Sequence, residues 1–141
     1  MQTFLPDPSF RKSAQILDNK RLGKQRLEAK QILQILVKEL DEGVSSSRWR
    51  NHPACRLWKD HERALATYGL AMCEEWSRRG FVDNQLDYFY RLMYLLTEQD
   101  MDVRFSDLLY SAHRAALLYK NLEHYKQFGW KEKPEIKYVW K

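Results

Sequence analysis

The sequence predicts an all-α protein: a compact single-domain bundle of about four main helices across residues 1–141, with an irregular aromatic and basic C-terminal tail. Three observations support this prediction. Apolar residues recur at the three- and four-residue spacing of amphipathic helices, and no alternating strand pattern interrupts them. Hydrophobic residues make up 44% of the chain, which is enough to form a core. Charged residues make up 30% and are mixed in sign, which argues against disorder.

The first predicted helix opens at Asp7 and Pro8, which suit the cap and the first helical position. Its apolar pattern continues to Leu40, and the sequence allows a break near Asp18. This helix is the longest element that the pattern predicts.

The second predicted helix begins at Pro53 and runs to Arg79, with Gly80 as the residue that ends it. Cys55 and Cys73 both fall in this helix, too far apart along its axis to form a disulfide. We therefore expect two buried thiols.

Two further helices and a tail complete the pattern. Asp83 caps a third helix over residues 84–98, and Ser106 opens a fourth that ends near Lys120. Residues 121–141 carry few helix signals but many aromatic residues and lysines, so we expect them to be irregular.

The charge balance is compatible with a nucleic-acid partner without requiring one. Lys and Arg number 24 against 19 Asp and Glu, a net charge of +5. No apolar run approaches the ~20 residues of a membrane-spanning helix, and the first residues lack the features of a secretory signal. We expect a cytoplasmic monomer with no membrane partner.

Polar side chains intrude on the apolar face of the first predicted helix. Asp18 and Gln25 project into that face, and Arg21 and Glu28 lie at its edge. One interpretation is structural, with an ion pair between Asp18 and Arg21 or between Lys24 and Glu28. The other is functional, because groups that cost stability gather at active sites. The sequence leaves both open.

Other candidate residues also have two interpretations. His52 is placed either to cap the second helix or to bind a phosphate there. Arg114 either grips a phosphate or lies along the core with its head in water. The tail residues Tyr125, Lys126 and Trp130 either hold unstacked bases or pin the chain end to the core. No His or Cys has metal-ligand spacing, so we expect neither a metal nor a cofactor.

Four short motifs together resemble a bacterial and phage branch of the pyrimidine-dimer DNA glycosylase, or endonuclease V, superfamily. They are residues 17–28 (LDNKRLGKQRLE), 49–53 (WRNHP), 111–114 (SAHR) and 138–140 (YVW). Arg21, His52 and Arg114 occupy matching places in the order of parts, and residues 124–129 (HYKQFG) resemble the aromatic tail of the phage enzymes. The resemblance implies a helical fold that kinks DNA and flips a nucleotide out of the stack. It also implies base excision in which an N-terminal amine forms a Schiff base with the sugar, followed by strand cleavage.

The chain departs from the family pattern at the nucleophile. The known enzymes have a small second residue, so their initiator Met is removed. Gln2 is too large for that trimming, so the amine of Met1 is the expected nucleophile of a covalent reaction, and a carboxylate-activated water is the alternative if the amine is not used.

A second departure concerns the catalytic carboxylate, which in the known enzymes follows the first-helix Arg directly. Leu22 holds that position here, next to Arg21. Asp18 and Glu28 are the available substitutes.

The leading hypothesis is therefore a DNA glycosylase, with or without abasic-site lyase activity, that acts on double-stranded DNA with a damaged or modified pyrimidine. The expected DNA-binding residues are Arg21, Lys24, Gln25, His52, Arg114, Tyr125, Lys126 and Trp130. The alternatives are a non-catalytic DNA-binding module of the same fold and an enzyme acting on a nucleotide-like small molecule.

Overall fold

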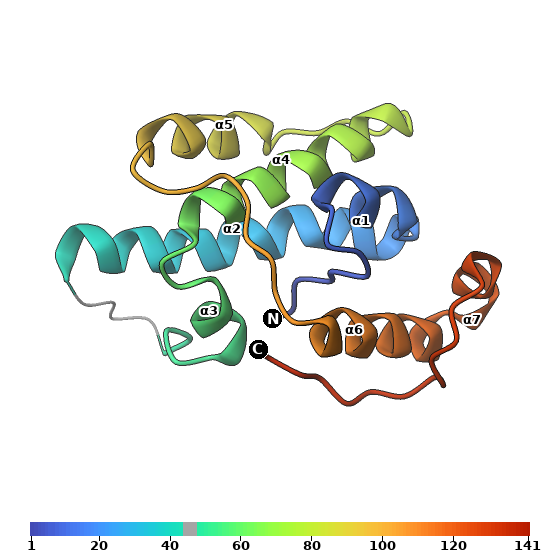
Figure 1. Ribbon diagram of the computed structural model, residues 1–141. Helices are drawn as coiled ribbons and strands as arrows, with labels where there is room; N and C mark the ends of the chain where they lie inside the picture. The colour runs from blue at the N-terminus through green and yellow to red at the C-terminus, as the bar shows by residue number, and fades with distance from the viewer. Residues whose placement is uncertain (44–47) are drawn as a thin grey trace.

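The computed structural model describes residues 1–43 and 48–141, and all regular structure in them is helical, which confirms the predicted fold class. Seven α-helices and one short 3-10 helix are described: α1 (Phe10–Ile16), α2 (Asn19–Glu42), α3 (Pro53–Trp58), α4 (Glu62–Arg78), α5 (Leu86–Leu95), α6 (Asp107–Lys120), α7 (Leu122–Tyr125) and η1 (Lys126–Phe128) (Figure 1). None of these helices has both the length and the apolar character needed to cross a bilayer.

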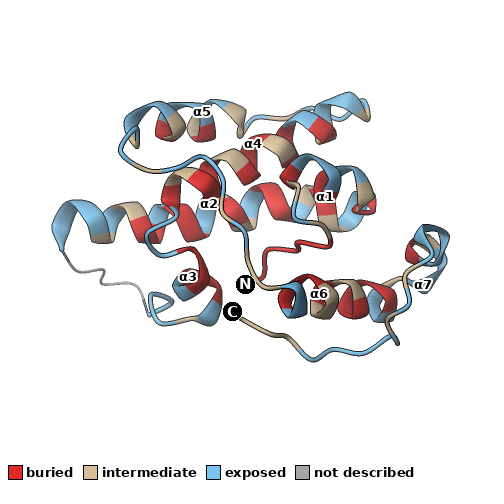
Figure 2. Ribbon diagram, in the orientation of Figure 1, coloured by how far each residue is buried: buried red, intermediate tan, exposed pale blue. Residues whose placement is uncertain are grey.

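Helices α2 and α4 pack against each other at the centre of the molecule (Figure 1). Helix α5 covers α4 from outside, and α1 packs against α4 as well. Helices α6 and α7 lie on the opposite side of α2 from α5, and the two chain ends lie side by side between α3 and α6 (Figure 1). The buried residues gather on α2, on α4 and along the N-terminal segment (Figure 2).

The prediction of one helix starting at Asp7 is wrong in its first turn. Ser9 caps α1, since its hydroxyl accepts the backbone N–H of Lys12 at 3.2 Å. The Asp7 carboxylate accepts the N–H of Ser9 at 2.8 Å and so forms a turn before the helix. The break that the sequence allows near Asp18 is present and separates α1 from α2.

The prediction of a single helix from Pro53 to Arg79 is wrong, because a break at residues 59–61 divides it into α3 and α4. Asp60 adopts a left-handed conformation with φ of 69°, and its N–H donates to the Glu62 carboxylate at 2.6 Å. Three residues nearly complete one helical turn, so the apolar spacing continues across the break and does not reveal it.

Cys55 and Cys73 consequently lie on different helices. Both thiols are buried and free, as expected. Burial raises the pKa of the Cys55 thiol to about 11, so it stays protonated and unreactive at neutral pH.

The third and fourth predicted helices are present. The Asp83 carboxylate accepts the N–H of Leu86 at 2.9 Å at the start of α5, which ends at Leu95, three residues earlier than predicted. Ser106 caps α6, which ends at Lys120 as expected.

The C-terminal tail is more regular than predicted at its start. Helices α7 and η1 follow α6 directly, and the Asn121 side chain caps α7 by accepting the N–H of His124 at 3.2 Å. The irregular tail is therefore confined to residues 129–141.

The N-terminal segment, residues 2–5, is buried and extended, and side chains from several helices satisfy its polar groups. The indole of Trp58 donates to the Thr3 hydroxyl at 2.9 Å, and the N–H of Leu5 donates to Nδ1 of His113 at 2.9 Å. His113 is fully buried, and burial lowers its pKa to about 3, so the ring is neutral and Nδ1 accepts a hydrogen bond.

The burial of His113 makes stability depend on pH. Its folded pKa lies below the ordinary value of 6.5, so its contribution is fully present above pH 6.5 and is lost as the pH falls from there through the folded pKa. We expect the free energy of unfolding to fall by about 1.4 kcal/mol per pH unit in this window from His113 alone. In His113→Asn, urea titrations between pH 6.5 and 5 should give a slope shallower by this amount. The exposed His61→Asn is the matched control, and an unchanged slope in His113→Asn would contradict the assignment.

Candidate active site

A pocket of about 360 Å³ lies beside the N-terminal segment, between α2, the end of α6 and the C-terminal tail. It brings together five of the predicted site residues: Met1, Arg21, Lys24, Gln25 and Glu28. Five further residues line it: Gln2, Phe4, Lys20, Lys120 and Tyr138. The pocket therefore joins both ends of the chain to the first turns of its longest helix.

Gln25 fastens the N-terminal segment to α2. Its Oε1 accepts the N–H of Phe4 at 2.9 Å and the hydroxyl of Tyr68 at 2.7 Å. Its Nε2 donates to the carbonyl of Gln2 at 3.1 Å and to the carboxylate of Glu28 at 3.2 Å. The side chain is 1% exposed and uses both of its ends, so its position on the apolar face of α2 is explained by these four bonds.

Glu28 is half-buried and orients toward the start of the chain. Its Oε2 accepts the N–H of Gln2 at 3.2 Å as well as the bond from Gln25. Among the described residues it forms no ion pair, so the pair with Lys24 that the sequence allows is not formed. Glu28 is the only carboxylate among the described residues that line the pocket, and it shares the pocket with Met1.

Positive charge is concentrated around this carboxylate. Lys20, Arg21 and Lys24 come from the first two turns of α2, and Lys120 comes from the last turn of α6. The first turn of α2 contains no acidic residue, and the carboxylate of its N-cap, Asp18, is already paired with Arg21. The pocket thus attracts anions.

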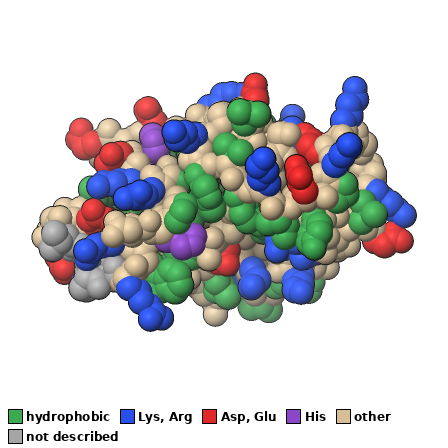
Figure 3. All heavy atoms as spheres, turned by 90° about the horizontal axis from the view of Figure 1, so that it is seen from below, with side chains coloured by type: hydrophobic (Ala, Val, Ile, Leu, Met, Phe, Trp, Pro, Cys, Tyr) green, Lys and Arg blue, Asp and Glu red, His purple; other side chains and the backbone are tan. Residues whose placement is uncertain are grey.

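Lys and Arg side chains are also numerous on the face of the molecule that carries α3, α6 and the chain ends. Figure 3 shows this face from below, with hydrophobic side chains through its middle and Lys and Arg side chains around them, with Asp and Glu side chains interspersed. A surface of this kind can contact phosphates at its edge and bases at its centre.

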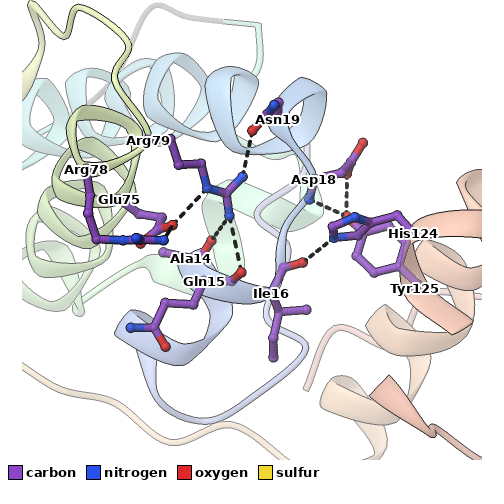
Figure 4. Close-up of polar contacts among 10 residues, drawn as sticks. All are labelled: Ala14, Gln15, Ile16, Asp18, Asn19, Glu75, Arg78, Arg79, His124 and Tyr125. Atoms are coloured by element: carbon purple, nitrogen blue, oxygen red, sulfur yellow. Dashed lines mark hydrogen bonds and ion pairs between the residues drawn. The ribbon is translucent and has the colours of Figure 1, made fainter. Parts of the chain in front are cut away.

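Asp18 forms the centre of a hydrogen-bond cluster outside the pocket, and Figure 4 shows its contacts with Tyr125. Its carboxylate accepts from the Tyr125 hydroxyl, from Arg21 Nη1 at 3.0 Å and from Asn121 Nδ2 at 3.4 Å. Its backbone N–H donates to the same Tyr125 hydroxyl at 3.0 Å. Burial works against ionisation, yet the hydrogen bond from Tyr125 and the charge of Arg21 hold the pKa of Asp18 below its ordinary value. The ion pair with Arg21 that the sequence allows is formed.

Arg79, the C-cap residue of α4, binds the turn between α1 and α2 from the other side (Figure 4). Its Nη2 donates to the carbonyls of Ala14 at 3.1 Å and Gln15 at 3.2 Å, and its Nη1 donates to Asn19 at 2.9 Å. Glu75 holds the guanidinium in place through a 2.8 Å ion pair. The start of α2 and its cations are therefore fixed relative to the core.

His52 is the N-terminal cap of α3, with Nδ1 accepting the N–H of Ala54 at 3.1 Å. Burial lowers its pKa, the positive amine of Met1 lowers it further, and the Glu28 carboxylate opposes both. His52 does not line the pocket, but these electrostatic effects indicate that it lies near the amine and the carboxylate.

Arg114 lies away from the pocket in a local ion pair. Its Nε and Nη2 both donate to Glu132, at 3.0 and 2.8 Å, and its Nη1 donates to the carbonyl of Pro6 at 3.0 Å. Most of its hydrogen-bonding capacity is therefore used to join α6, the tail and the N-terminal segment.

The predicted tail residues also lie outside the pocket. Tyr125 is fully buried and stacks on the half-buried Trp130 with ring centroids 5.7 Å apart. Lys126 is exposed and forms a 2.9 Å ion pair with Glu123. Tyr125 therefore fits the interpretation in which the tail residues attach the chain end to the core.

Sequence reasoning did not select the pocket residues that come from far along the chain. Lys120 and Tyr138 reach the pocket only through the packing of α6 and the tail, and no local pattern could place them there. The only sequence features that point to Lys20 and Tyr138 are their places in the motifs: Lys20 precedes Arg21 in residues 17–28, and Tyr138 is the first residue of 138–140. Among the described residues, no three His, Cys, Asp or Glu side chains lie close enough to hold a metal ion.

Comparison with known proteins gives one match. The model of a family described as pyrimidine dimer DNA glycosylase matches residues 1–89. No curated protein and no solved structure matches the chain. The matched segment contains α1 to α4 and eight of the ten residues that line the pocket.

The four hydrogen bonds of Gln25 predict a large stability cost for its removal. Gln25→Leu keeps an apolar stem but leaves the N–H of Phe4 and the carbonyl of Gln2 buried without partners, so we expect a loss of about 2–4 kcal/mol in urea unfolding. The control is Gln31→Leu at an exposed position of the same helix, which should change stability little. A loss below about 1 kcal/mol would mean that Gln25 does not fasten the segment.

Proposed function

Because this chain belongs to the pyrimidine dimer DNA glycosylase family, we propose that the pocket beside the N-terminal segment is the active site of a DNA repair glycosylase that also cleaves abasic sites. The observation that carries this proposal is the presence of a terminal amine, a single carboxylate and four cations around one cavity. The amine supplies a nucleophile, the carboxylate moves protons, and the cations bind the phosphates on either side of the nucleotide.

In the proposed reaction the neutral amine of Met1 attacks C1′ of the damaged nucleotide. The N–C1′ bond forms as the C1′–N1 glycosidic bond breaks, and the base leaves with the bonding electron pair and takes up a proton. The nitrogen then loses one proton and its lone pair forms the C1′=N bond as the bond from C1′ to the ring oxygen breaks; the ring oxygen leaves with the bonding pair and takes up a proton, which gives a protonated Schiff base. Removal of a proton from C2′ expels the 3′-phosphate, whose oxygen keeps the electron pair of the broken C3′–O bond.

Glu28 is the proposed proton-transfer group. Its Oε2 is occupied by the N–H of Gln2 and by Gln25, so the carboxylate is held next to the first residue of the chain. Oε1 has no hydrogen-bond partner among the described residues and is available to take a proton from the attacking amine or to return one. Asp18, by contrast, is engaged on both oxygens by Tyr125 and Arg21, so we assign it the task of orienting Arg21.

Borohydride trapping tests the proposal directly. The protein is incubated with a duplex carrying a thymine photodimer, and separately with one carrying an abasic site, in the presence of borohydride. We expect a covalent adduct with both duplexes that maps to Met1 and is lost after acetylation of the amine. Salt-sensitive binding with neither adduct nor base release would favour a non-catalytic DNA-binding module, and absence of DNA binding at low salt would favour a small-molecule substrate.

Replacing the carboxylate separates its chemical role from its structural one. Glu28→Gln keeps a side-chain oxygen for the N–H of Gln2, so we expect normal thermal unfolding, but base release should fall by about 100-fold or more. Glu42→Gln, at an exposed position of the same helix, is the control. Retention of full activity in Glu28→Gln would remove Glu28 from the mechanism.

A further inference from the structure

The side-chain amide of Gln2 has no hydrogen-bond partner in the described residues, although the residue is only 8% exposed. Its backbone is fully engaged, with the N–H bound to Glu28 and the carbonyl bound to Gln25. Both polar atoms of the amide are nonetheless buried in the wall of the pocket without a donor or an acceptor. A buried amide without partners costs stability, and such groups in native proteins call for a functional explanation.

The phenol of Tyr138 stands next to this amide in the same wall. Burial raises the pKa of Tyr138, the nearby Gln2 amide lowers it, and the charges of Glu28 and Arg21 also act on it. Tyr138 lines the pocket together with these three groups, although its hydroxyl does not have hydrogen-bond geometry toward the Gln2 amide. Its ring packs 6.5 Å from that of Phe4, which also lines the pocket.

Tyr138 stands in the C-terminal tail, which is joined to α6. Glu132 of the tail forms a 2.8 Å ion pair with Arg114, and the N–H of Glu135 donates to the carbonyl of Ala115. The Gln2 amide is shielded from solvent, so a ligand that pairs with it has to displace the half-exposed phenol of Tyr138.

A carboxamide presents one donor and one acceptor side by side, and it pairs with a ring edge that carries a neighbouring acceptor and donor. The N3–H and the adjacent carbonyl of thymine form such an edge. Photodimerisation joins thymines through C5 and C6 and leaves this edge intact. A pocket of about 360 Å³ is of the size that holds a small ligand.

We propose that Gln2, assisted by the Tyr138 hydroxyl, is the specificity-determining residue that pairs with the N3–H and carbonyl edge of a damaged pyrimidine in the pocket. The proposal rests on the glycosylase function proposed above and names the group that reads the base. The cations of the pocket cannot do this, because they bind phosphates irrespective of sequence.

The test compares base release, in which the damaged base takes part, with trapping on an abasic site, from which the base is already missing. Gln2→Leu removes both hydrogen-bonding atoms, and Gln2→Glu removes the donor. Both variants keep a large second residue, and intact mass verifies that Met1 is retained. For each variant, kcat/KM for base release from photodimer DNA is divided by the rate of borohydride trapping on DNA with a ready-made abasic site. We expect this ratio to fall about tenfold or more in both variants, and less in Tyr138→Phe.

Stability provides an independent readout. Because the Gln2 amide has no partner, Gln2→Leu should unfold at the same temperature as the wild type or higher. The matched controls are Gln15→Leu and Tyr119→Phe, both at exposed positions outside the pocket, which should leave the ratio unchanged.

Two results would overturn the base-reading role: an unchanged ratio in Gln2→Leu, or an equal loss on both duplexes. A wild type that traps on neither duplex and releases no base would instead overturn the glycosylase function, and this proposal with it.

Discussion

The structure depends on the burial of an extended N-terminal segment that has neither a strand partner nor helical bonds of its own. Each of its backbone groups must find a side chain, and Gln25 supplies the central pair by binding Phe4 on one side and Gln2 on the other. Glu28, Tyr68 and His113 bind further backbone groups of Gln2, Phe4 and Leu5. The start of the chain is therefore held like a core element rather than fraying as chain ends usually do.

The same bonds that satisfy the segment also assemble the pocket. Gln25 and Glu28 lie one turn apart on α2, so the helix surface that holds the segment also presents the carboxylate. Arg21 lies one turn earlier and is oriented by Asp18, which is held in turn by Tyr125 from the other end of the chain. Structural roles and the proposed chemical roles are thus divided among polar residues on or beside one apolar face of α2.

Sequence reasoning identified this face because helical spacing shows which polar residues fall on the apolar side of a helix, and such residues are unusual. Gln25 and Glu28 were found in this way, whereas the extent of α6 was predicted from Ser106 as its cap. The break at residues 59–61 escaped because it preserves the apolar period. The ion pair of Arg114 with Glu132, and the arrival of Tyr138 at the pocket, depend on contacts between distant segments that no periodicity encodes.

The cations at the start of α2 have a consequence for the response of the protein to ionic strength. Arg21 is paired with Asp18, but Lys20 and Lys24 are exposed and form no ion pair among the described residues, so they and the positive end of the helix repel one another in the folded state. Dissolved salt screens that repulsion and favours folding, while the same screening weakens attraction for a polyanion. High salt therefore stabilises the folded state of the free protein and at the same time weakens its binding to DNA. At low salt, the phosphates of bound DNA screen the same cations that dissolved counter-ions screen at high salt.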